Sequence, residues 1–239
     1  MRASFQGFPK AGLQFLRDLE LNNEREWFDA HKATYTEVVK PAVEALVASV
    51  GAGLMKFAPA YATEPKKAIY RIYRDTRFSH NKTPYKTNVG ALFYRADLGK
   101  NEASAFYVEI SPKHVGIAGG CYMPDAERLR LIRVHIAENY GRFSKLVGAK
   151  ALVASMGELQ GERLSRPPKG FPAEHPAVEV LKGKQWYYWR EFPPETALTP
   201  GVVKEILTRF QVMLPVVEFL NEPMAAARKQ RAPLETGWV

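Results

Sequence analysis

The sequence predicts an α+β protein in which a mainly antiparallel sheet packs with N-terminal and C-terminal helices. Apolar residues recur every three or four positions in the first 54 residues and again in residues 203–214, as on the buried faces of helices. Between these regions, segments rich in β-branched and aromatic residues follow one another with short connections. Strands joined in this way form antiparallel sheets, because parallel pairing needs long crossover connections.

The N-terminal region is predicted to be helical. Leucines spaced by three over residues 13–19 indicate a first short helix. Asn23 followed by Glu26 has the form of a capping box, in which each side chain satisfies a free backbone N–H group. The next helix carries an aromatic face and extends to Pro41, which ends it or begins a new helix with an apolar stripe over residues 43–54.

Strand-like segments occupy the middle of the chain. The ranges expected to form strands are 67–74, 89–95, 105–110, 114–117 and 185–192. Gly119-Gly120 is expected to close the central run. The aromatic residues 186–189 fit a strand that lies between core and rim, and Cys121 fits a small buried apolar position.

Helical periodicity returns after the central strands. Residues 124–147 show it in two pieces, and residues 157–176 are expected to form a loop. Thr199-Pro200 predicts the start of a long helix that bends or breaks near Pro215. The tail from about residue 223 is expected to be partly extended. Because the chain contains no repeat and no low-complexity linker, residues 1–239 are expected to form a single α+β domain.

Composition predicts a cytoplasmic protein with no membrane partner. Hydrophobic residues make up 46% of the 239 residues and charged residues 25%, as in ordinary globular proteins. A single cysteine excludes an intrachain disulfide and fits a reducing compartment. Residues 1–20 lack the apolar stretch of a signal peptide, and no apolar run approaches the roughly 20 residues that span a bilayer.

Positive charge is concentrated in one short stretch. The formal net charge is +9, and residues 66–86 hold seven Lys/Arg against one aspartate, a local balance of +6. Such a concentration fits an anionic partner, either nucleic acid or a phosphorylated small molecule. The single carboxylate of Asp75 cannot neutralise its neighbours. The excess charge therefore points to solvent, pairs with a distant acid such as Glu109, or meets an anion.

The same stretch carries a pattern that resembles the signature of an uncharacterised bacterial family, domain of unknown function 2461. The pattern is Arg-x-x-Arg-Asp-x-Arg-Phe over residues 71–78, followed by Lys-x-Pro-Tyr over residues 82–85. Gly119-Gly120-x-Tyr122-x-Pro124 and residues 166–171 fit the same family. The resemblance implies one α+β domain and marks the signature positions, but it implies no activity, substrate or cofactor. Those positions are Arg71, Arg74, Asp75, Arg77, Phe78, Lys82 and Tyr85.

Three interpretations of the signature stay open. In the first, it binds an anion: arginine forks and lysine charges hold the ligand, and a tyrosine donates a hydrogen bond. The residues in these roles are Arg71, Arg74, Arg77, Lys82, Lys86 and Tyr85. In the second, the protein is a hydrolase or transferase that acts on a phosphate ester, with Asp75 or His80 as acid or base. In the third, the signature is an internal salt-bridge network of a structural or interaction module.

The sequence offers no support for a metal site. The five histidines are scattered, without HExxH or paired Cys/His spacing. Phosphate-binding glycine motifs are absent as well. The sequence therefore predicts no metal site and leaves both the cofactor and the oligomeric state open.

Overall fold

A computed structural model describes residues 5–231 of the chain. The N-terminal helices are α1 (Lys10–Leu21), α2 (Arg25–Ala30), α3 (Lys32–Thr34), the π-helical turn η1 (Tyr35–Val39), α4 (Lys40–Leu54), η2 (Pro59–Tyr61) and α5 (Pro65–Ala68). The strands are β1 (Val89–Phe93), β2 (Ala105–Ile110), β3 (Val115–Cys121) and β4 (Trp186–Phe192). The remaining helices are α6 (Ala126–Glu138), α7 (Tyr140–Val147), α8 (Lys150–Met156), α9 (Val178–Leu181), η3 (Pro194–Leu198) and α10 (Gly201–Arg231).

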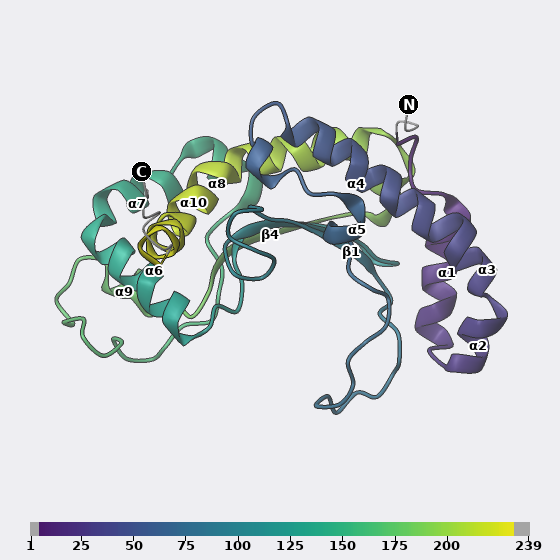
Figure 1. The fold of residues 1–239 in the computed structure, drawn as a ribbon, viewed down its shortest axis with the longest axis horizontal. Helices are drawn as coiled ribbons and strands as arrows, with labels where there is room; N and C mark the ends of the chain where they lie inside the picture. Colours follow the sequence, from purple (N-terminus) through teal and green to yellow (C-terminus); the bar gives the residue numbers. More distant parts are fainter. Residues whose placement is uncertain (1–4, 232–239) are drawn as a thin grey trace, which may run out of the picture.

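The predicted α+β class is confirmed. The strands form one four-stranded antiparallel sheet in the order β1-β2-β3-β4. Figure 1 shows α4 and α10 lying along one face of this sheet, while loops hang below the other face. The arrangement leaves one sheet face without a covering helix, and this face holds the cavity described below.

The core lies between the sheet and α10. Ile206, Phe210 and Met213 of that helix are fully buried. The ring of Phe210 stacks on Phe106 of β2 at a centroid distance of 4.6 Å and meets Phe93 of β1 edge-on. Burial of such large apolar side chains is the main force that holds a helix on a sheet.

The predicted strand over residues 67–74 is wrong. Pro65 starts the helical turn α5, which ends at Ala68, and the segment that follows has only isolated bridges. One of them joins Tyr73 to Tyr85 within the charged stretch. The tyrosines and isoleucines of this segment are typical of strands, but here they do not form one. Ile72 is instead buried in the core.

Gly119-Gly120 continue β3 and do not end it, contrary to the expectation. They pair with Tyr188 and Tyr187 of β4. A side chain at Gly119 would collide with Met213 and Phe106 in the core. Glycine here lets the helix and the neighbouring strand pack closely against β3, which is a common reason for glycine inside a strand.

The capping box at Asn23 is also wrong. The N-cap of α2 is Glu24, and no side chain caps the helix. The Asn23 amide instead bonds to both backbone groups of Tyr85: Nδ2 donates to the carbonyl oxygen and Oδ1 accepts from the N–H, each at 3.0 Å. Asn23 therefore bonds to Tyr85, 62 residues away, and not to the start of its own helix. This contact joins the charged stretch to the N-terminal helices.

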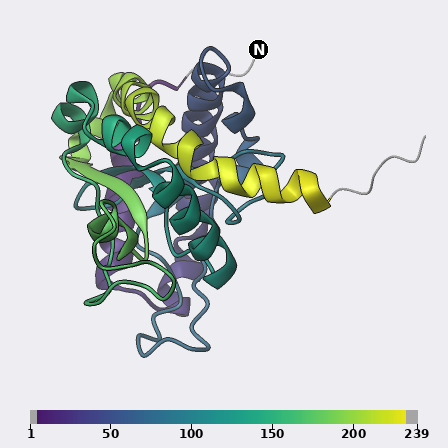
Figure 2. The ribbon, with the colours of Figure 1, turned by 90° about the vertical axis from the view of Figure 1, so that its left-hand side faces the viewer.

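Prolines interrupt the helices less than expected. Pro41 lies in the first turn of α4, which follows η1 directly. The helix α10 continues past Pro215 and Pro223 to its end at Arg231, so the extended tail is wrong up to residue 231, and residues 232–239 lie outside the described part. The helix changes direction along its length, as interior prolines cause, and its last part leaves the body of the protein (Figures 1 and 2).

Within residues 5–231, no helix combines the length and the apolar composition that crossing a membrane requires.

Candidate functional site

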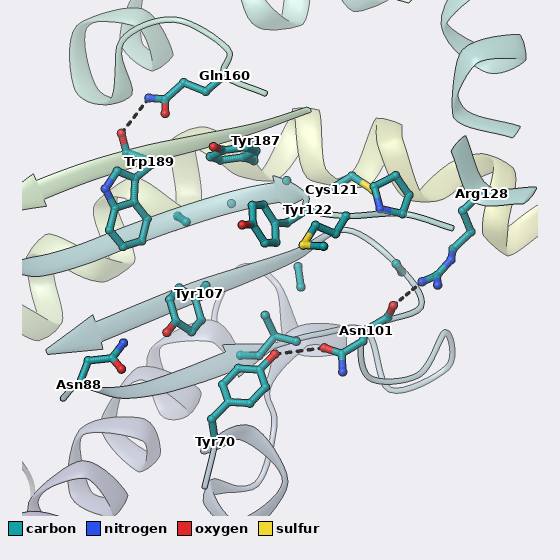
Figure 3. A pocket seen from close by; sticks show the side chains of 18 of the residues that line it. Tyr70, Asn88, Asn101, Tyr107, Cys121, Tyr122, Arg128, Gln160, Tyr187 and Trp189 are labelled. Carbon is teal, nitrogen blue, oxygen red and sulfur yellow. Dashed lines mark hydrogen bonds between the residues drawn. The ribbon is translucent and has the colours of Figure 1, made fainter. Parts of the chain in front are cut away.

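A cavity of about 840 Å³ lies on the helix-free face of the sheet. Its floor comes from all four strands, and its walls come from the segment before β1, the β1–β2 connection and the start of α6. Figure 3 shows the aromatic side chains of Tyr70, Tyr107, Tyr187 and Trp189 around it. A cavity of this size suits a small-molecule ligand.

The strand register builds the floor. Leu92 pairs with Tyr107, Tyr107 with Ala118, and Ala118 with Trp189, so these four side chains form one row across the sheet. Paired residues in antiparallel strands share a face, and alternate residues point to opposite faces. Trp186 and Tyr188 of β4 point to the opposite face from Trp189, and they are accordingly buried in the core. Along this row, the large aromatic side chains of Tyr107 and Trp189 flank the small side chain of Ala118.

Two glycines give the floor rings their positions. A Cβ atom on Gly90 would lie 2.3 Å from the Tyr107 hydroxyl oxygen, and one on Gly116 would lie 2.1 Å from the Trp189 ring. Both rings thus lie across glycines of the neighbouring strand. Any larger residue at either glycine would displace a ring from the cavity floor.

Lys86 lines one corner of the cavity, and two further cations lie close enough to lower its pKa: Arg71, which is exposed, and Lys100, whose Nζ donates to the Lys67 carbonyl oxygen at 2.7 Å. We call Arg71, Lys86 and Lys100 the cation corner. The ammonium groups of Lys86 and Lys100 lie 5.0 and 4.5 Å from the centroid of the Tyr70 ring. Burial lowers the pKa of Lys86, and the charges of Arg71 and Lys100 lower it further. Within residues 5–231, no member of the cation corner forms an ion pair with a carboxylate.

The nearest acid, Glu109, is already engaged. One of its oxygens accepts hydrogen bonds from the Tyr107 hydroxyl at 2.7 Å and from the Asn88 amide, and the other bonds to Nε2 of His114 at 2.9 Å. Its charge raises the pKa of Lys86 by less than the other influences lower it. Glu109 therefore orders the floor of the cavity and leaves much of the positive charge uncompensated.

The residues expected to bind an anion fall into three groups. Arg71 and Lys86 belong to the cation corner. The chain between them forms a loop that projects from the sheet (Figures 1 and 2). Residues 74–83 form the projecting part, which we call the finger. Tyr85 is buried and stacks on Phe28 of α2 at 4.1 Å, so it belongs to the core and fastens the loop.

Cations in the finger are bonded within the finger. Arg77 forms a bidentate pair with Asp75, at 3.0 and 2.7 Å. Arg74 donates to the backbone carbonyl and the hydroxyl of Thr83, and Nζ of Lys82 donates to the backbone carbonyl of Thr76 at 2.9 Å. Among the described residues, the finger thus holds one exposed ion pair, Arg77 with Asp75, and hydrogen bonds from Arg74 and Lys82 to its own residues.

The two proposed acid–base residues lie in the finger and not on the cavity wall. The hydrogen bonds and charge of Arg77 lower the pKa of Asp75 to about 2. A carboxylate of such low basicity is a poor proton acceptor near neutral pH. His80 is exposed.

Sequence patterns did not single out Tyr70 and Tyr107 of the cavity or Lys100 of the cation corner, whereas Trp189 belongs to the aromatic run noted in the sequence. Two signals were present. Four consecutive aromatic residues occupy positions 186–189, and only small residues occupy positions 116–120 apart from Ile117. Together they indicate a strand with one apolar face and one open face.

No group of three or more metal-binding side chains occurs in the part of the chain that the structure describes. Cys121 borders the cavity but is buried, and burial raises the pKa of its thiol to about 12. A thiol that stays protonated is a weak nucleophile and a weak metal ligand.

Fold and cavity together define the class: an α+β protein whose antiparallel sheet is covered by helices on one face and carries an aromatic, cation-bordered cavity on the other. The chain belongs to the family described as conserved hypothetical protein (DUF2461), whose model matches residues 11–219. This match confirms the family resemblance. Comparison with curated proteins and with solved structures finds no significant match.

Proposed function

We propose that this protein is a cytoplasmic protein that binds a phosphorylated small molecule in the cavity, with the anionic group against the cation corner. The observation that carries the proposal is the uncompensated charge of Arg71, Lys86 and Lys100 beside a cavity of small-molecule size. Partly buried cations that repel one another are stabilised by an anion between them. An anionic group would thereby relieve the repulsion that lowers the pKa of Lys86.

The cavity favours a small ligand over a nucleic-acid strand. Its volume of about 840 Å³ falls in the range of ligand pockets, roughly 300–1,000 Å³. The finger, which would otherwise present the longest run of cations to a polymer, uses Arg74, Arg77 and Lys82 in its own hydrogen bonds. We therefore place anion binding at the root of the signature and a structural role in its finger.

One lysine variant in the cation corner and one in the finger test this division. Lys86→Ala is expected to weaken binding of ribose 5-phosphate, pyrophosphate or AMP by about tenfold to a hundredfold, because a charge-assisted hydrogen bond contributes roughly 1.5–3 kcal/mol. Lys82→Ala removes the same charge from the finger and is expected to leave the dissociation constants unchanged. Isothermal titration calorimetry measures both.

The pH dependence gives a second readout. An anion binds the protonated form of Lys86, whose pKa lies below its ordinary value of 10.5. Affinity is therefore expected to be complete at neutral pH and to fall as the pH rises through this lowered pKa. The fall should be smaller in Lys86→Ala, where Lys100, whose pKa burial also lowers, still titrates. Equal losses in the two lysine variants, or a wild-type protein that binds none of the three probes at roughly 10 mM, would contradict the proposal.

One observation favours an enzyme that acts on a phosphate ester as the second candidate. Glu109 accepts a hydrogen bond from the hydroxyl of Tyr107 on the cavity floor and also pairs with His114 at 2.9 Å. A histidine oriented by a carboxylate is a common general base. Release of inorganic phosphate from the bound ester, lost in His114→Gln, would separate this candidate from simple binding.

A further inference from the structure

The wall of the cavity that lies across from the cation corner is apolar. The ring of Tyr122 meets the ring of Tyr187 edge-on at a centroid distance of 5.3 Å, and Met123 follows it on the cavity wall. Figure 3 shows these two tyrosines across the cavity from Tyr70, the ring that lies beside the lysines of the cation corner. We call Tyr122 and Met123 the apolar lip.

Both side chains of the apolar lip are open to solvent. The exposed fraction is 66% for Tyr122 and 68% for Met123, high values for large apolar residues. Neighbouring apolar side chains that stay exposed beside a cavity are typical of a surface that a ligand covers. The apolar lip therefore favours a ligand with an apolar group at this end of the cavity.

The backbone of Met123 adopts a conformation that is unfavourable for methionine. Its φ is +50°, in the left-handed region where the Cβ atom of an L-residue crowds the following carbonyl oxygen. Within residues 5–231, the only other non-glycine residue with a positive φ is Asn101, which also lines the cavity. Asparagine tolerates this region better than methionine does. Strain that holds an exposed apolar side chain on a cavity wall indicates a role in binding.

The distance between the two ends sets the length of the ligand. Near the cation corner, the ring of Tyr70 contacts Tyr107 of β2 at a centroid distance of 6.1 Å. Tyr187 lies on β4, two strand spacings or roughly 10 Å from β2. Only the small residues Ala105 and Gly120 precede Tyr187 in its row across β2 and β3. A ligand about 10 Å long can therefore lie over the sheet and reach both ends.

We infer that the ligand is an elongated phosphate ester with an aromatic ring at its far end, and that the apolar lip binds this ring; the inference rests on the proposed function and specifies its ligand. The phosphate meets the cation corner, and the ring lies against Tyr122 and Met123. Tyrosine rings and the methionine thioether both form favourable contacts with an aromatic ring.

The test compares two ligands that differ only in the ring. Butyl phosphate and 4-phenylbutyl phosphate carry the same anionic group and the same four-carbon chain. The wild-type protein is expected to bind 4-phenylbutyl phosphate about tenfold more tightly, the effect of removing roughly 60 Å² of apolar surface from water. Isothermal titration calorimetry measures both dissociation constants.

Met123→Asn separates a role in binding from a role in folding. Because asparagine suits a φ of +50° and Met123 is exposed, the urea midpoint should stay the same or rise. The preference for 4-phenylbutyl phosphate should fall to threefold or less, and the affinity for ribose 5-phosphate should stay unchanged. The matched control is Met55→Asn, at an exposed methionine after α4 and away from the cavity, which should keep the full preference.

The outcomes distinguish this inference from the proposed function. If ribose 5-phosphate binds and the two alkyl phosphates bind equally well, the aromatic group is overturned and anion binding stands. A preference that survives both Met123→Asn and Tyr122→Ala would overturn the apolar lip as the surface that binds the ring. Failure of all three compounds to bind would overturn both proposals. If Met123→Asn does not fold, Tyr122→Ala, which also changes an exposed side chain, decides alone.

Discussion

Asn221→Ala is expected to lower the free energy of unfolding by about 4 kcal/mol. Asn221 lies in α10 with its side chain fully buried. Its Oδ1 accepts from the backbone N–H of Ser104 at 2.7 Å, and its Nδ2 donates to the Ser104 carbonyl at 2.9 Å and to the Tyr61 hydroxyl at 2.8 Å. Alanine would leave three buried polar groups without these partners, at roughly 1–3 kcal/mol each before relaxation.

Urea denaturation measures this effect, and two variants calibrate it. Tyr61→Phe removes one of the three contacts and should cost about 1 kcal/mol. Asn22→Ala removes an exposed asparagine whose side chain bonds only to the Asp18 carbonyl, and it should change stability by less than about 0.5 kcal/mol. A loss for Asn221→Ala no larger than that for Asn22→Ala would show that this network does not join α10 to the sheet.

Gly120→Ala is expected to cost about 3 kcal/mol and to disturb the cavity as well. Gly120 has a φ of +135°, and a Cβ atom there would lie 2.3 Å from the Trp186 carbonyl oxygen and 2.6 Å from the Tyr187 Cα. These are backbone atoms of β4, so the collision cannot be relieved by a side-chain rotation. The strand itself must shift, and Trp189 shifts with it.

A second glycine supplies the control. Gly141 is exposed in α7, and a Cβ atom there meets nothing within 4 Å. Gly141→Ala should therefore stabilise the protein by up to about 1 kcal/mol, because alanine is the better helix former. Denaturation midpoints of the two variants should lie on opposite sides of the wild type, and equal midpoints would contradict the close approach of β3 to β4 at Gly120.

Local patterns predicted most elements of the fold. The segments 105–110 and 185–192 are rich in β-branched and aromatic residues, and both form strands with nearly the predicted bounds. Prediction failed where a distant partner decided the outcome. Asn23 has the local form of a helix cap, yet the backbone of Tyr85 takes its amide. A single sequence does not reveal such a partner.

The candidate site was predicted only in part, for a related reason. The sequence shows that cations cluster in this stretch. It does not show which of them lie beside the cavity and which lie in the finger, because that depends on how the chain folds back between Arg74 and Thr83. The row of Tyr107, Ala118 and Trp189 on the cavity floor depends on the register of three strands. Small residues at 116–120 are a weak signal alone and become informative only when Tyr107 and Trp189 are placed beside them.

A crystal structure of the wild-type protein with ribose 5-phosphate tests the central claim most directly, because it locates the anion. The proposal predicts a phosphate between Lys86, Arg71 and Lys100, in contact with the cavity. A phosphate held by Arg74 and Arg77 in the finger, with only solvent in the cavity, would contradict it.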